Sequence, residues 1–561
     1  MLNKAQNEVV QSNAEKLLVL AGAGTGKTTT MLARISRLVD ENKVDVQSIL
    51  VLTFTNAAAC EMRDRYRRSH QNQQTPTFCT FHSFCYSLIA GNRDVARRLG
   101  YFKGTPFVAD ETTLHKVKTM CRQKCGTKIS DDKLNGKTPV TKSEQFQKDL
   151  YWKQYNKLLR AQNLITFDIM CYEVCKLFVS DDMTITATKD QFKYVFVDEF
   201  QDTDPKQWDF VSSFTNANLF VCGDAKQAIY RFRGADSSII KSLAESTEWT
   251  TIKLSENYRS SAQICDYSND IHKAWKGSAY NLDIISTKHG SDVIEREELD
   301  SQSNQEIMNM VSDASNGKTV AILCRTNYEV ADIRQRLESL DIAFCTKNER
   351  KDVSYILKSA IDPEFLVDWL SDKLTSSRYN EYLKLCAIDE KHKTEESFFS
   401  MYGKYLTEYL TPIMQIREIL ANEQFAYSKI TQISDVLNLP NREVNLKSDD
   451  DKSIIEYLCG VAESVTNSSN IYIGTIHSVK GLEYDCVHLL GVNGKSFPIG
   501  KDEDQQNLFY VGCTRAKEKL VIYDSDWSDT SDIPTDEEIK MEISDAEKYS
   551  EKLIKMVVED M

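Results

Sequence analysis

The chain is 561 residues long, with 41% hydrophobic, 27% charged and 10% aromatic residues. This length is several times that of a usual domain, which excludes a small binding module, and the composition excludes wholesale disorder and collagen-like structure. No apolar run predicts a membrane span or a secretory signal, so we expect an intracellular protein, assigned to the cytoplasm with a nuclear location left open, and no membrane partner.

The charge is unevenly distributed along the chain. The formal net charge is −14, but residues 93–160 carry 16 basic and 7 acidic residues, and residues 524–561 carry 4 basic and 13 acidic residues. A basic segment offers a surface for phosphates, whereas a solvated helix face is the alternative explanation. The overall acidity therefore does not exclude a nucleic-acid partner.

Short apolar runs bounded by turn residues recur along the chain and predict strands buried on both faces of parallel sheets. They are KLLVLAG (16–22), SILVLTF (48–54), KYVFVDE (193–199), NLFVCGD (218–224), TIKLS (251–255), VAILCR (320–325), CVHLLGV (486–492) and KLVIY (519–523). Helical patterns lie between several of them, as over residues 31–39. This alternation predicts an α/β protein with two sheets, interrupted by helix-like sequence at 89–164 and 346–465.

Two pairs of cysteines have CxxxC spacing: Cys121 with Cys125, and Cys171 with Cys175. Four thiolates could bind zinc or an iron–sulfur cluster. The interpretation that we favour is structural, because thiols four residues apart in an apolar helix lie on one buried face.

The sequence GAGTGKT directly follows the first predicted strand and precedes a helical pattern. This context is that of a P-loop, whose backbone N–H groups surround phosphates while Lys27 contacts the β- and γ-phosphates and Thr28 binds Mg²⁺. The sequence therefore predicts an ATP site formed by Gly22, Ala23, Gly24, Thr25, Gly26, Lys27, Thr28 and the adjoining Thr29.

An acidic pair, Asp198 and Glu199, ends the third predicted strand. A carboxylate at this position of a P-loop protein holds Mg²⁺, and its neighbour orients and deprotonates the attacking water. We therefore expect Asp198 to bind the metal, together with Thr28, and Glu199 to act as the base.

The ordered motifs of the whole chain resemble those of superfamily 1 DNA helicases of the UvrD/Rep/PcrA branch. They are LNKAQ (2–6), the P-loop, TFTN (53–56), TFHS (80–83), VDEFQD (197–202), CGDAKQ (222–227), YRFRGA (230–235), NYRS (257–260), CRTN (324–327), GTIH (474–477), KGLE (480–483) and YVGCTRA (510–516). Each motif alone is weak, but the ordered set is specific.

The resemblance implies two RecA-like P-loop motor domains with parallel sheets, each with a mainly helical insertion. The expected boundaries are 1–88 and 165–260 for the first motor domain, 89–164 for its insertion, 261–345 and 466–525 for the second, 346–465 for its insertion, and 526–561 for an acidic tail. Within the tail, a capping box at Thr535–Glu538 and apolar spacing predict a helix over 536–557. This helix either packs on the second motor domain as structure, or is a detachable acidic arm that competes with DNA for basic surface or docks a protein loading partner.

The resemblance also assigns roles at the ATP site. It implies that Gln6 reads the adenine edge, Tyr258 stacks on the adenine and Glu483 bonds the ribose. Arg259 and Arg515 are implied to reach the γ-phosphate, which suits a forked, permanently charged guanidinium, and Gln227 is implied to be the sensor beside it. Binding of ATP would then close a cleft between the two motor domains, and hydrolysis would open it.

A second group of motif residues is implied to bind single-stranded DNA by stacking and polar contacts. It consists of Phe54, Asn56, Phe81, His82, Tyr230, Phe232, Arg233, Asn327 and His477. Core packing is the alternative for each ring.

The chain departs from the family pattern at several positions. It has Ala57 where the family usually has lysine, Thr29 where it has arginine, and Gln506 and Asn507 in place of two arginines. These departures leave the strength of DNA and nucleotide binding open, and the short insertions indicate minimal accessory domains.

The sequence thus predicts an ATP- and Mg²⁺-dependent translocase and helicase that acts on single-stranded and tailed duplex DNA, in 3′-to-5′ direction, in repair or replication. One alternative is an ATP-gated DNA-binding factor that displaces or recruits proteins. Another is an RNA helicase or a 5′-to-3′ helicase of the same superfamily.

Overall fold

The computed structural model describes residues 2–70, 74–109, 111–127, 129–134, 139–180, 183–288, 294–297, 304–346, 349–361, 411–422, 425–437, 448, 450–464, 469–492, 497 and 502–523. The chain forms two compact units. The first comprises Met1–Ile294 and Ile499–Lys519, and the second comprises Glu295–Pro498 and Leu520–Met561. The predicted tail helix at 536–557 lies outside the described residues.

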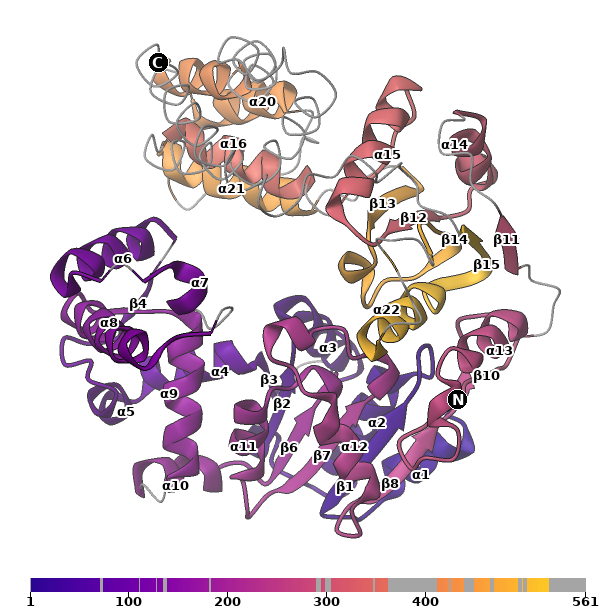
Figure 1. The fold of residues 1–561 in the computed structure, drawn as a ribbon, viewed down its shortest axis with the longest axis horizontal. Coiled ribbons are helices and arrows are strands. Elements are labelled where there is room, and N and C mark those ends of the chain that lie inside the picture. Colours follow the sequence, from indigo (N-terminus) through magenta and orange to yellow (C-terminus); the bar gives the residue numbers. More distant parts are fainter. Residues whose placement is uncertain are drawn as a thin grey trace. The chain divides into compact units, whose positions relative to one another are not determined.

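The first unit is built on a six-stranded sheet in the order β3-β2-β6-β7-β1-β8 (Figure 1). All its neighbouring strands are parallel, as the buried apolar runs predicted. The strands are β1 (Lys16–Ala21), β2 (Ile49–Thr53), β3 (Thr77–Thr80), β6 (Tyr194–Val197), β7 (Asn218–Gly223) and β8 (Thr250–Leu254).

Helices cover both faces of this sheet, which explains why its strands do not alternate between apolar and polar residues. Leu17 and Val19 of β1 share a core with Met31, whereas Leu18 and Leu20 share a core with Phe210. The helices are α1 (Lys4–Gln11), α2 (Lys27–Asp40), α3 (Asn56–Ser69), α4 (Phe81–Gly91), α9 (Phe167–Val179), α10 (Met183–Asp190), α11 (Pro205–Ser212), α12 (Ser237–Glu245), α13 (Ala262–Asp270) and α22 (Glu503–Cys513).

The first insertion is mainly helical and has its own core. It contains α5 (Arg93–Arg98), α6 (Glu111–Cys125), α7 (Asp131–Leu134), α8 (Lys142–Ala161) and a short parallel pair, β4 (Phe107–Val108) with β5 (Leu164–Ile165). Val117 of α6 packs with Tyr151 and Leu158 of α8. The insertion is therefore a folded element and not an extended loop.

The second unit contains a five-stranded sheet in the order β11-β15-β14-β12-β13. These strands are β11 (Ile294–Glu297), β12 (Val320–Cys324), β13 (Ile471–Thr475), β14 (Tyr484–Leu489) and β15 (Ala516–Tyr523), and β12 is parallel to β13 and β14. Helices α14 (Asn304–Val311) and α15 (Asn327–Ser339) accompany the sheet, and the described part of its insertion is helical: α16 (Glu349–Ile361), residues 411–421, α20 (Ala426–Val436) and α21 (Asp451–Ser464). The fold is thus α/β with two parallel-sheet domains, each with a mainly helical insertion.

One segment groups differently from its predicted domain. We expected 466–525 to complete the second motor domain, whereas 499–519, which include α22, group with the first unit. The reason is a set of buried polar contacts: Asn507 Nδ2 donates to the Ala228 carbonyl (2.9 Å), and its Oδ1 hydrogen-bonds His272 Nε2 (2.7 Å).

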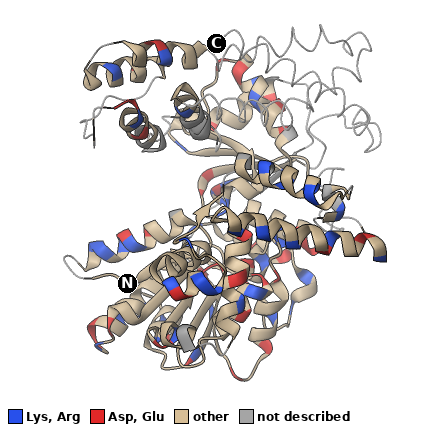
Figure 2. Ribbon diagram, turned by 90° about the vertical axis from the view of Figure 1, so that its left-hand side faces the viewer, with Lys and Arg blue, Asp and Glu red and all other residues tan. Residues whose placement is uncertain are grey.

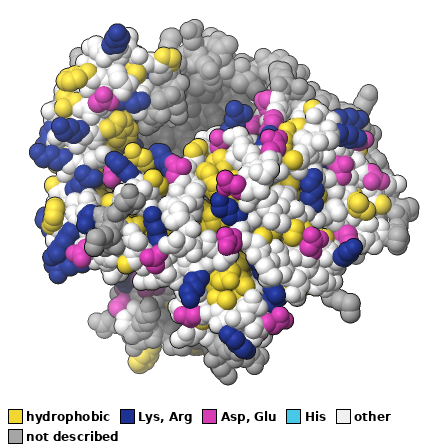
Figure 3. Space-filling model, turned by 90° about the horizontal axis from the view of Figure 1, so that it is seen from below, with side chains coloured by type: hydrophobic (Ala, Val, Ile, Leu, Met, Phe, Trp, Pro, Cys, Tyr) yellow, Lys and Arg dark blue, Asp and Glu magenta, His cyan; other side chains and the backbone are white. Residues whose placement is uncertain are grey.

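Basic and acidic residues are both distributed along the helices (Figure 2), and on the face seen in Figure 3 charged side chains of both signs alternate with hydrophobic ones. Within the described ranges, none of the helices has the length and apolar character that a membrane crossing requires.

Candidate active site

The P-loop lies between β1 and α2, and its backbone requires glycine at two positions. Gly24 and Gly26 have φ of 68° and 80°. A Cβ at Gly24 would lie 2.7 Å from Arg259 Cβ, and one at Gly26 would lie 2.8 Å from Gln6 Nε2. Both glycines therefore allow the loop to turn and let two predicted site residues approach it closely.

The predicted acidic pair lies beside the P-loop lysine. The salt bridge between Lys27 Nζ and Glu199 Oε2 measures 3.3 Å, and the Lys27 side chain is only 12% exposed. Burial alone would lower the pKa of Lys27, but the carboxylates of Glu199, Asp198 and Asp224, with Cys222, raise it above its ordinary value. Lys27 is thus held charged within an excess of negative charge.

Glu199 adopts a left-handed backbone conformation, with φ of 49° and ψ of 44°. A non-glycine residue in this region carries roughly 1–3 kcal/mol of strain, which is common at functional sites. The Glu199 carboxylate accepts a 2.6 Å hydrogen bond from Gln201 Nε2, and Gln201 Oε1 accepts one from the Asp224 amide (3.0 Å). Gln201 therefore connects the turn after β6 with the turn after β7.

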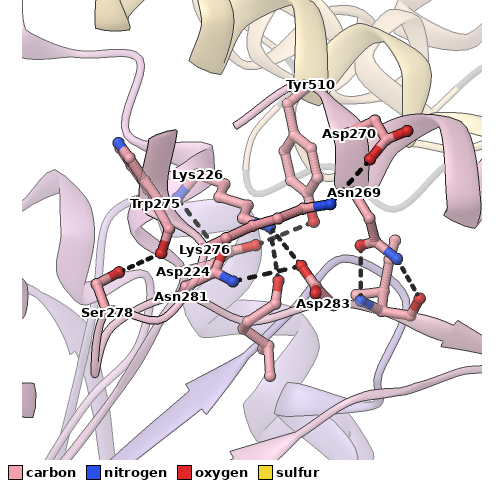
Figure 4. A network of polar contacts seen from close by, with 12 residues as sticks. Asp224, Lys226, Asn269, Asp270, Trp275, Lys276, Ser278, Asn281, Asp283 and Tyr510 are labelled. Atoms are coloured by element: carbon pink, nitrogen blue, oxygen red, sulfur yellow. Dashed lines mark hydrogen bonds and ion pairs between the residues drawn. The ribbon is translucent and has the colours of Figure 1, made fainter. Parts of the chain in front are cut away.

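The turn after β7 forms the short helix η3 (Ala225–Gln227). Asp224 Oδ2 accepts a hydrogen bond from Gln227 Nε2 (2.7 Å) and one from the Tyr510 hydroxyl (3.4 Å). The neighbouring Lys226 is buried and donates to the Leu282 carbonyl (2.8 Å). Figure 4 shows Lys226 together with Asp224 and Tyr510. These contacts hold Gln227 in a buried polar network.

The two predicted arginines lie near one another in the first unit. Arg259 Nη1 donates to the Thr514 carbonyl (3.3 Å), and Arg515 Nη2 donates to the Thr514 hydroxyl (3.1 Å). Arg515 is 2% exposed. Asn257 orients Arg259, because its Oδ1 accepts from the Arg259 amide (2.8 Å) while its Nδ2 donates to the Ala23 carbonyl of the P-loop (2.7 Å).

The predicted adenine-binding residues also lie close together. Gln6 is buried and its Nε2 donates to the Thr25 carbonyl (3.1 Å). Asn3 caps α1 by accepting from the Gln6 amide (2.7 Å) and donates to the Tyr258 hydroxyl (2.8 Å). Tyr258 is 43% exposed. Its ring is accordingly available for stacking.

Three predicted site residues belong to the second unit: Asn327, His477 and Glu483. Asn327 begins α15 and is exposed, His477 lies half-buried in η8 (Ile476–Val479), and Glu483 is exposed before β14. The residues of the ATP site described above all belong to the first unit.

An aromatic surface follows the turn after η3. The rings of Phe54 and Tyr230 stack with centroids 5.0 Å apart and planes at 14°. Phe232 is 70% exposed and lies 6.1 Å from Tyr230, and the Arg233 guanidinium carbon lies 5.1 Å from the Tyr230 ring centroid. An exposed ring beside a guanidinium suits stacking on bases next to a phosphate backbone.

The TFHS motif divides into core and surface residues. Phe81 is 6% exposed and packs edge-on against Phe210, so it belongs to the core and we do not retain it among the DNA contacts. His82 is half-buried against the exposed Phe167. Asn56 is exposed and accepts a hydrogen bond from Ser83 Oγ (3.1 Å).

Sequence reasoning did not assign a role to several residues that organise this site. They are Asn3, Gln201, Asp224, Asn257 and Tyr510. All five lie within or directly beside the quoted motifs, and this position is the signal by which the sequence could have identified them. Their roles depend on hydrogen bonds between segments that are distant in the sequence.

The structure describes the surroundings of two residues that depart from the family pattern. Thr29 is exposed at the first turn of α2. Asn507 is 1% exposed and hydrogen-bonds Ala228 and His272, so an amide here holds α22 against the turn after β7.

A P-loop beside an acidic strand end, with two arginines and a buried glutamine nearby, defines the class as a P-loop ATPase. The UvrD/REP helicase N-terminal domain family matches residues 2–248, and the UvrD-like helicase C-terminal domain family matches residues 252–352 and 366–526.

Similar proteins include the ATP-dependent DNA helicase PcrA of Staphylococcus epidermidis, 26% identical over 93% of this chain and 83% of the relative. The PcrA of Bacillus subtilis is 27% identical over 93% of this chain and 82% of the relative. A probable DNA helicase II homolog of Mycoplasma genitalium is 26% identical over 93% of this chain and 84% of the relative. The chain belongs to the UvrD/Rep/PcrA branch of superfamily 1, a family of ATP-dependent DNA helicases with roles in DNA repair and replication.

Proposed function

We propose that this chain is an ATP-dependent translocase that moves 3′ to 5′ along single-stranded DNA and unwinds tailed duplexes. The observation that carries the proposal is the placement of Lys27 and Glu199, 3.3 Å apart, in a network that also contains Gln201, Asp224 and Gln227. The family membership supports ATP and DNA as substrates.

The donor set at the P-loop fits a magnesium ion. Thr28 offers a hydroxyl oxygen and Asp198 a carboxylate oxygen, the hard ligands that Mg²⁺ prefers. Asp198, Glu199 and Asp224 act electrostatically on a single Lys27, so the site has negative charge in excess. Bound Mg²⁺ would neutralise that excess and charge on the phosphates.

The protein groups divide the chemistry between them. Glu199 orients the attacking water and accepts its proton, and Lys27 stabilises negative charge on the phosphates. Arg259 and Arg515 are proposed to stabilise the charge that develops on the γ-phosphate, with Gln227 as its sensor. Gln6 and Tyr258 hold the adenine, and Glu483 of the second unit bonds the ribose.

The polar network suggests how hydrolysis is coupled to DNA. A change at Glu199 reaches Gln201 through a 2.6 Å hydrogen bond and the turn after β7 through a 3.0 Å hydrogen bond. That turn leads to Tyr230 and Phe232, and we propose that the aromatic surface changes its hold on DNA as the cleft between the motor domains closes and opens. Asn56, His82, Asn327 and His477 complete the proposed path.

The test of this function is ATP hydrolysis measured with and without single-stranded DNA. We expect hydrolysis to require Mg²⁺ and to rise when DNA is added, because the turn after β7 belongs to the polar network of the ATP site and leads directly to the aromatic surface. Hydrolysis that is indifferent to DNA would instead favour an ATP-gated factor with no translocation.

Replacing Phe232 with alanine should weaken single-stranded DNA binding and leave basal hydrolysis nearly unchanged. A stacked base contributes about 1–3 kcal/mol, so the dissociation constant should rise roughly 5- to 150-fold. Fluorescence anisotropy with a labelled oligonucleotide measures this change. The control is Phe425→Ala, since Phe425 is 91% exposed and lies outside the motifs. An equal loss of basal hydrolysis with a lower melting temperature would show that Phe232 is structural.

We also propose that the acidic tail regulates access to DNA or serves a loading partner. Deleting residues 526–561 removes 12 acidic and 4 basic residues, which raises the net charge from −14 to −6. The truncated chain should bind DNA several-fold more tightly at low salt, with the difference fading as salt screens the charges. Unchanged low-salt affinity in a folded truncation would exclude competition between tail and DNA.

A further inference from the structure

Helices α13 and α22 are neighbours within the first unit, and both proposed arginines lie at one end of this pair. Arg259 lies just before α13, and Arg515 lies just after α22. The hydroxyl of Ser260, next to Arg259, donates to the carbonyl of Ala516, next to Arg515 (2.6 Å). The two helices are therefore joined at the end where the arginines lie.

A second contact joins the helices toward their other end. His272 lies just after α13, and its Nε2 hydrogen-bonds Asn507 Oδ1 of α22 (2.7 Å). Asn507 Nδ2 also donates to the carbonyl of Ala228 (2.9 Å), the residue that directly follows Gln227. The helix pair therefore runs antiparallel, with the arginines at one end and the turn that holds Gln227 near the other.

Both partners of this second contact are buried. Asn507 and His272 are each 1% exposed. The His272 ring packs against Trp275, with centroids 4.6 Å apart, and edge-on against Tyr510 of α22, at 5.7 Å. Removing one partner of a buried hydrogen bond leaves the other unsatisfied away from water, which costs more than the bond itself contributes. The contact therefore fixes the spacing of the two helices at this end.

The Ala228 carbonyl fixes the orientation of the Asn507 amide and the tautomer of His272. A carbonyl oxygen only accepts, so the atom of Asn507 that faces it is the amide nitrogen Nδ2. Its Oδ1 then faces His272, and the ring must donate from Nε2. Burial lowers the pKa of His272 to about 4, against the opposing effect of the hydrogen bond with Asn507, so the ring is uncharged near neutral pH. The other ring nitrogen, Nδ1, is buried and has no hydrogen-bond partner among the described residues.

We propose that Asn507 and His272 are positioning residues for ATP hydrolysis, which hold α13 and α22 so that both arginines can stabilise the charge that develops on the γ-phosphate. This role depends on the function proposed above for Arg259 and Arg515. Asn507 and His272 act through the two helices and not by contact with ATP. Because Asn507 stands where the family usually has arginine, the contact is a feature of this chain and does not follow from the family pattern.

A positioning role predicts a particular kinetic change. Contacts that strengthen only in the transition state set kcat, whereas contacts made already with bound ATP set nucleotide affinity. Lys27 and Gln6, which are proposed to hold ATP in the ground state, do not belong to the α13–α22 pair. A displaced helix pair should therefore leave ATP affinity nearly unchanged and weaken the binding of a transition-state analogue, ADP with Mg²⁺ and aluminium fluoride.

The variants His272→Asn and His272→Gln test this expectation. Glutamine can place an amide donor where Nε2 lies, whereas the shorter asparagine ends near Nδ1 and leaves Asn507 without its donor. His272→Asn should lower kcat and the affinity for ADP–aluminium fluoride roughly 10- to 100-fold, the effect of a misplaced catalytic group. Its affinity for a non-hydrolysable ATP analogue should stay within about twofold of wild type. His272→Gln should recover most of the loss.

Steady-state hydrolysis and calorimetric titration of the full chain with the two nucleotides measure these effects. The control is Gln506→Ala, which alters the half-buried neighbour of Asn507 on the same helix and should behave as wild type. Wild-type kcat in His272→Asn, or equal losses of affinity for both nucleotides, would overturn the positioning role. A large fall in the melting temperature of His272→Asn, or no recovery by His272→Gln, would assign the pair to fold stability and also overturn it.

The variant Arg515→Ala tests the underlying function separately. It should lose more affinity for ADP–aluminium fluoride than His272→Asn does. If Arg515→Ala bound the analogue like wild type, the proposed role of this arginine would be wrong. If Arg515→Ala lost affinity for the analogue and His272→Asn did not, only the positioning role would fail.

The wild-type chain offers a second measurement that does not depend on the activity of a variant. In the chain labelled with ¹⁵N-histidine, the nuclear magnetic resonance signal of His272 is the one absent from the His272→Gln spectrum. We expect the signal of a neutral ring protonated at Nε2. A ring protonated at Nδ1, or charged near neutral pH, would exclude the contact with Asn507 and with it the proposal.

Discussion

Glu199→Gln should abolish ATP turnover while ATP binding is retained. The amide keeps the shape of the side chain but cannot accept a proton, so we expect the turnover number to fall roughly 10²- to 10⁴-fold, the range of general-base catalysis. Binding should be unchanged or tighter, because the variant removes a negative charge 3.3 Å from Lys27. Steady-state hydrolysis and titration with a fluorescent nucleotide separate the two effects.

The matched control is Glu248→Gln, which removes the same charge from a residue paired with Lys16 on the surface. It should behave as wild type. Near-normal DNA-stimulated hydrolysis by the Glu199→Gln chain would remove Glu199 from the mechanism.

Lys27→Ala should weaken ATP binding as well as turnover. The variant deletes a phosphate contact that exists already in the ground state, and charged hydrogen bonds contribute about 1.5–3 kcal/mol, or roughly 10- to 150-fold in affinity. It also leaves the carboxylates of Asp198, Glu199 and Asp224 without the lysine that they stabilise. Their repulsion of the phosphates adds to the loss.

Lys16→Ala provides the control for this second variant, since Lys16 begins β1, the strand before the P-loop, and is paired with Glu248 at the surface. Nucleotide titration should show wild-type affinity for it. If Lys27→Ala bound ATP as tightly as Lys16→Ala does, the assignment of Lys27 as a phosphate ligand would be wrong.

The parts of the site that the sequence predicts best are those built within one strand–turn–helix segment. The P-loop and the acidic pair each follow a buried strand directly, and parallel strands bring their carboxyl ends to the same edge of the sheet. Gln6 and Tyr258 were predicted as adenine-binding residues only through the family resemblance. Their proximity depends on Asn3, which hydrogen-bonds both.

Other features depend on packing between distant segments and had no local signal. Phe81 lies in a motif, yet its ring packs on Phe210, more than a hundred residues later. The grouping of 499–519 with the first unit follows from the buried bonds of Asn507.

The measurement that tests the central claim most directly is strand displacement from two duplexes that differ only in the polarity of their single-stranded tail. We expect ATP-dependent unwinding of the 3′-tailed duplex and none of the 5′-tailed duplex, and no unwinding of either duplex by the Glu199→Gln chain. Preferential unwinding of the 5′-tailed duplex would contradict the proposed direction. Failure to displace either strand, despite DNA-stimulated hydrolysis, would contradict the proposal that this chain is itself the unwinding motor.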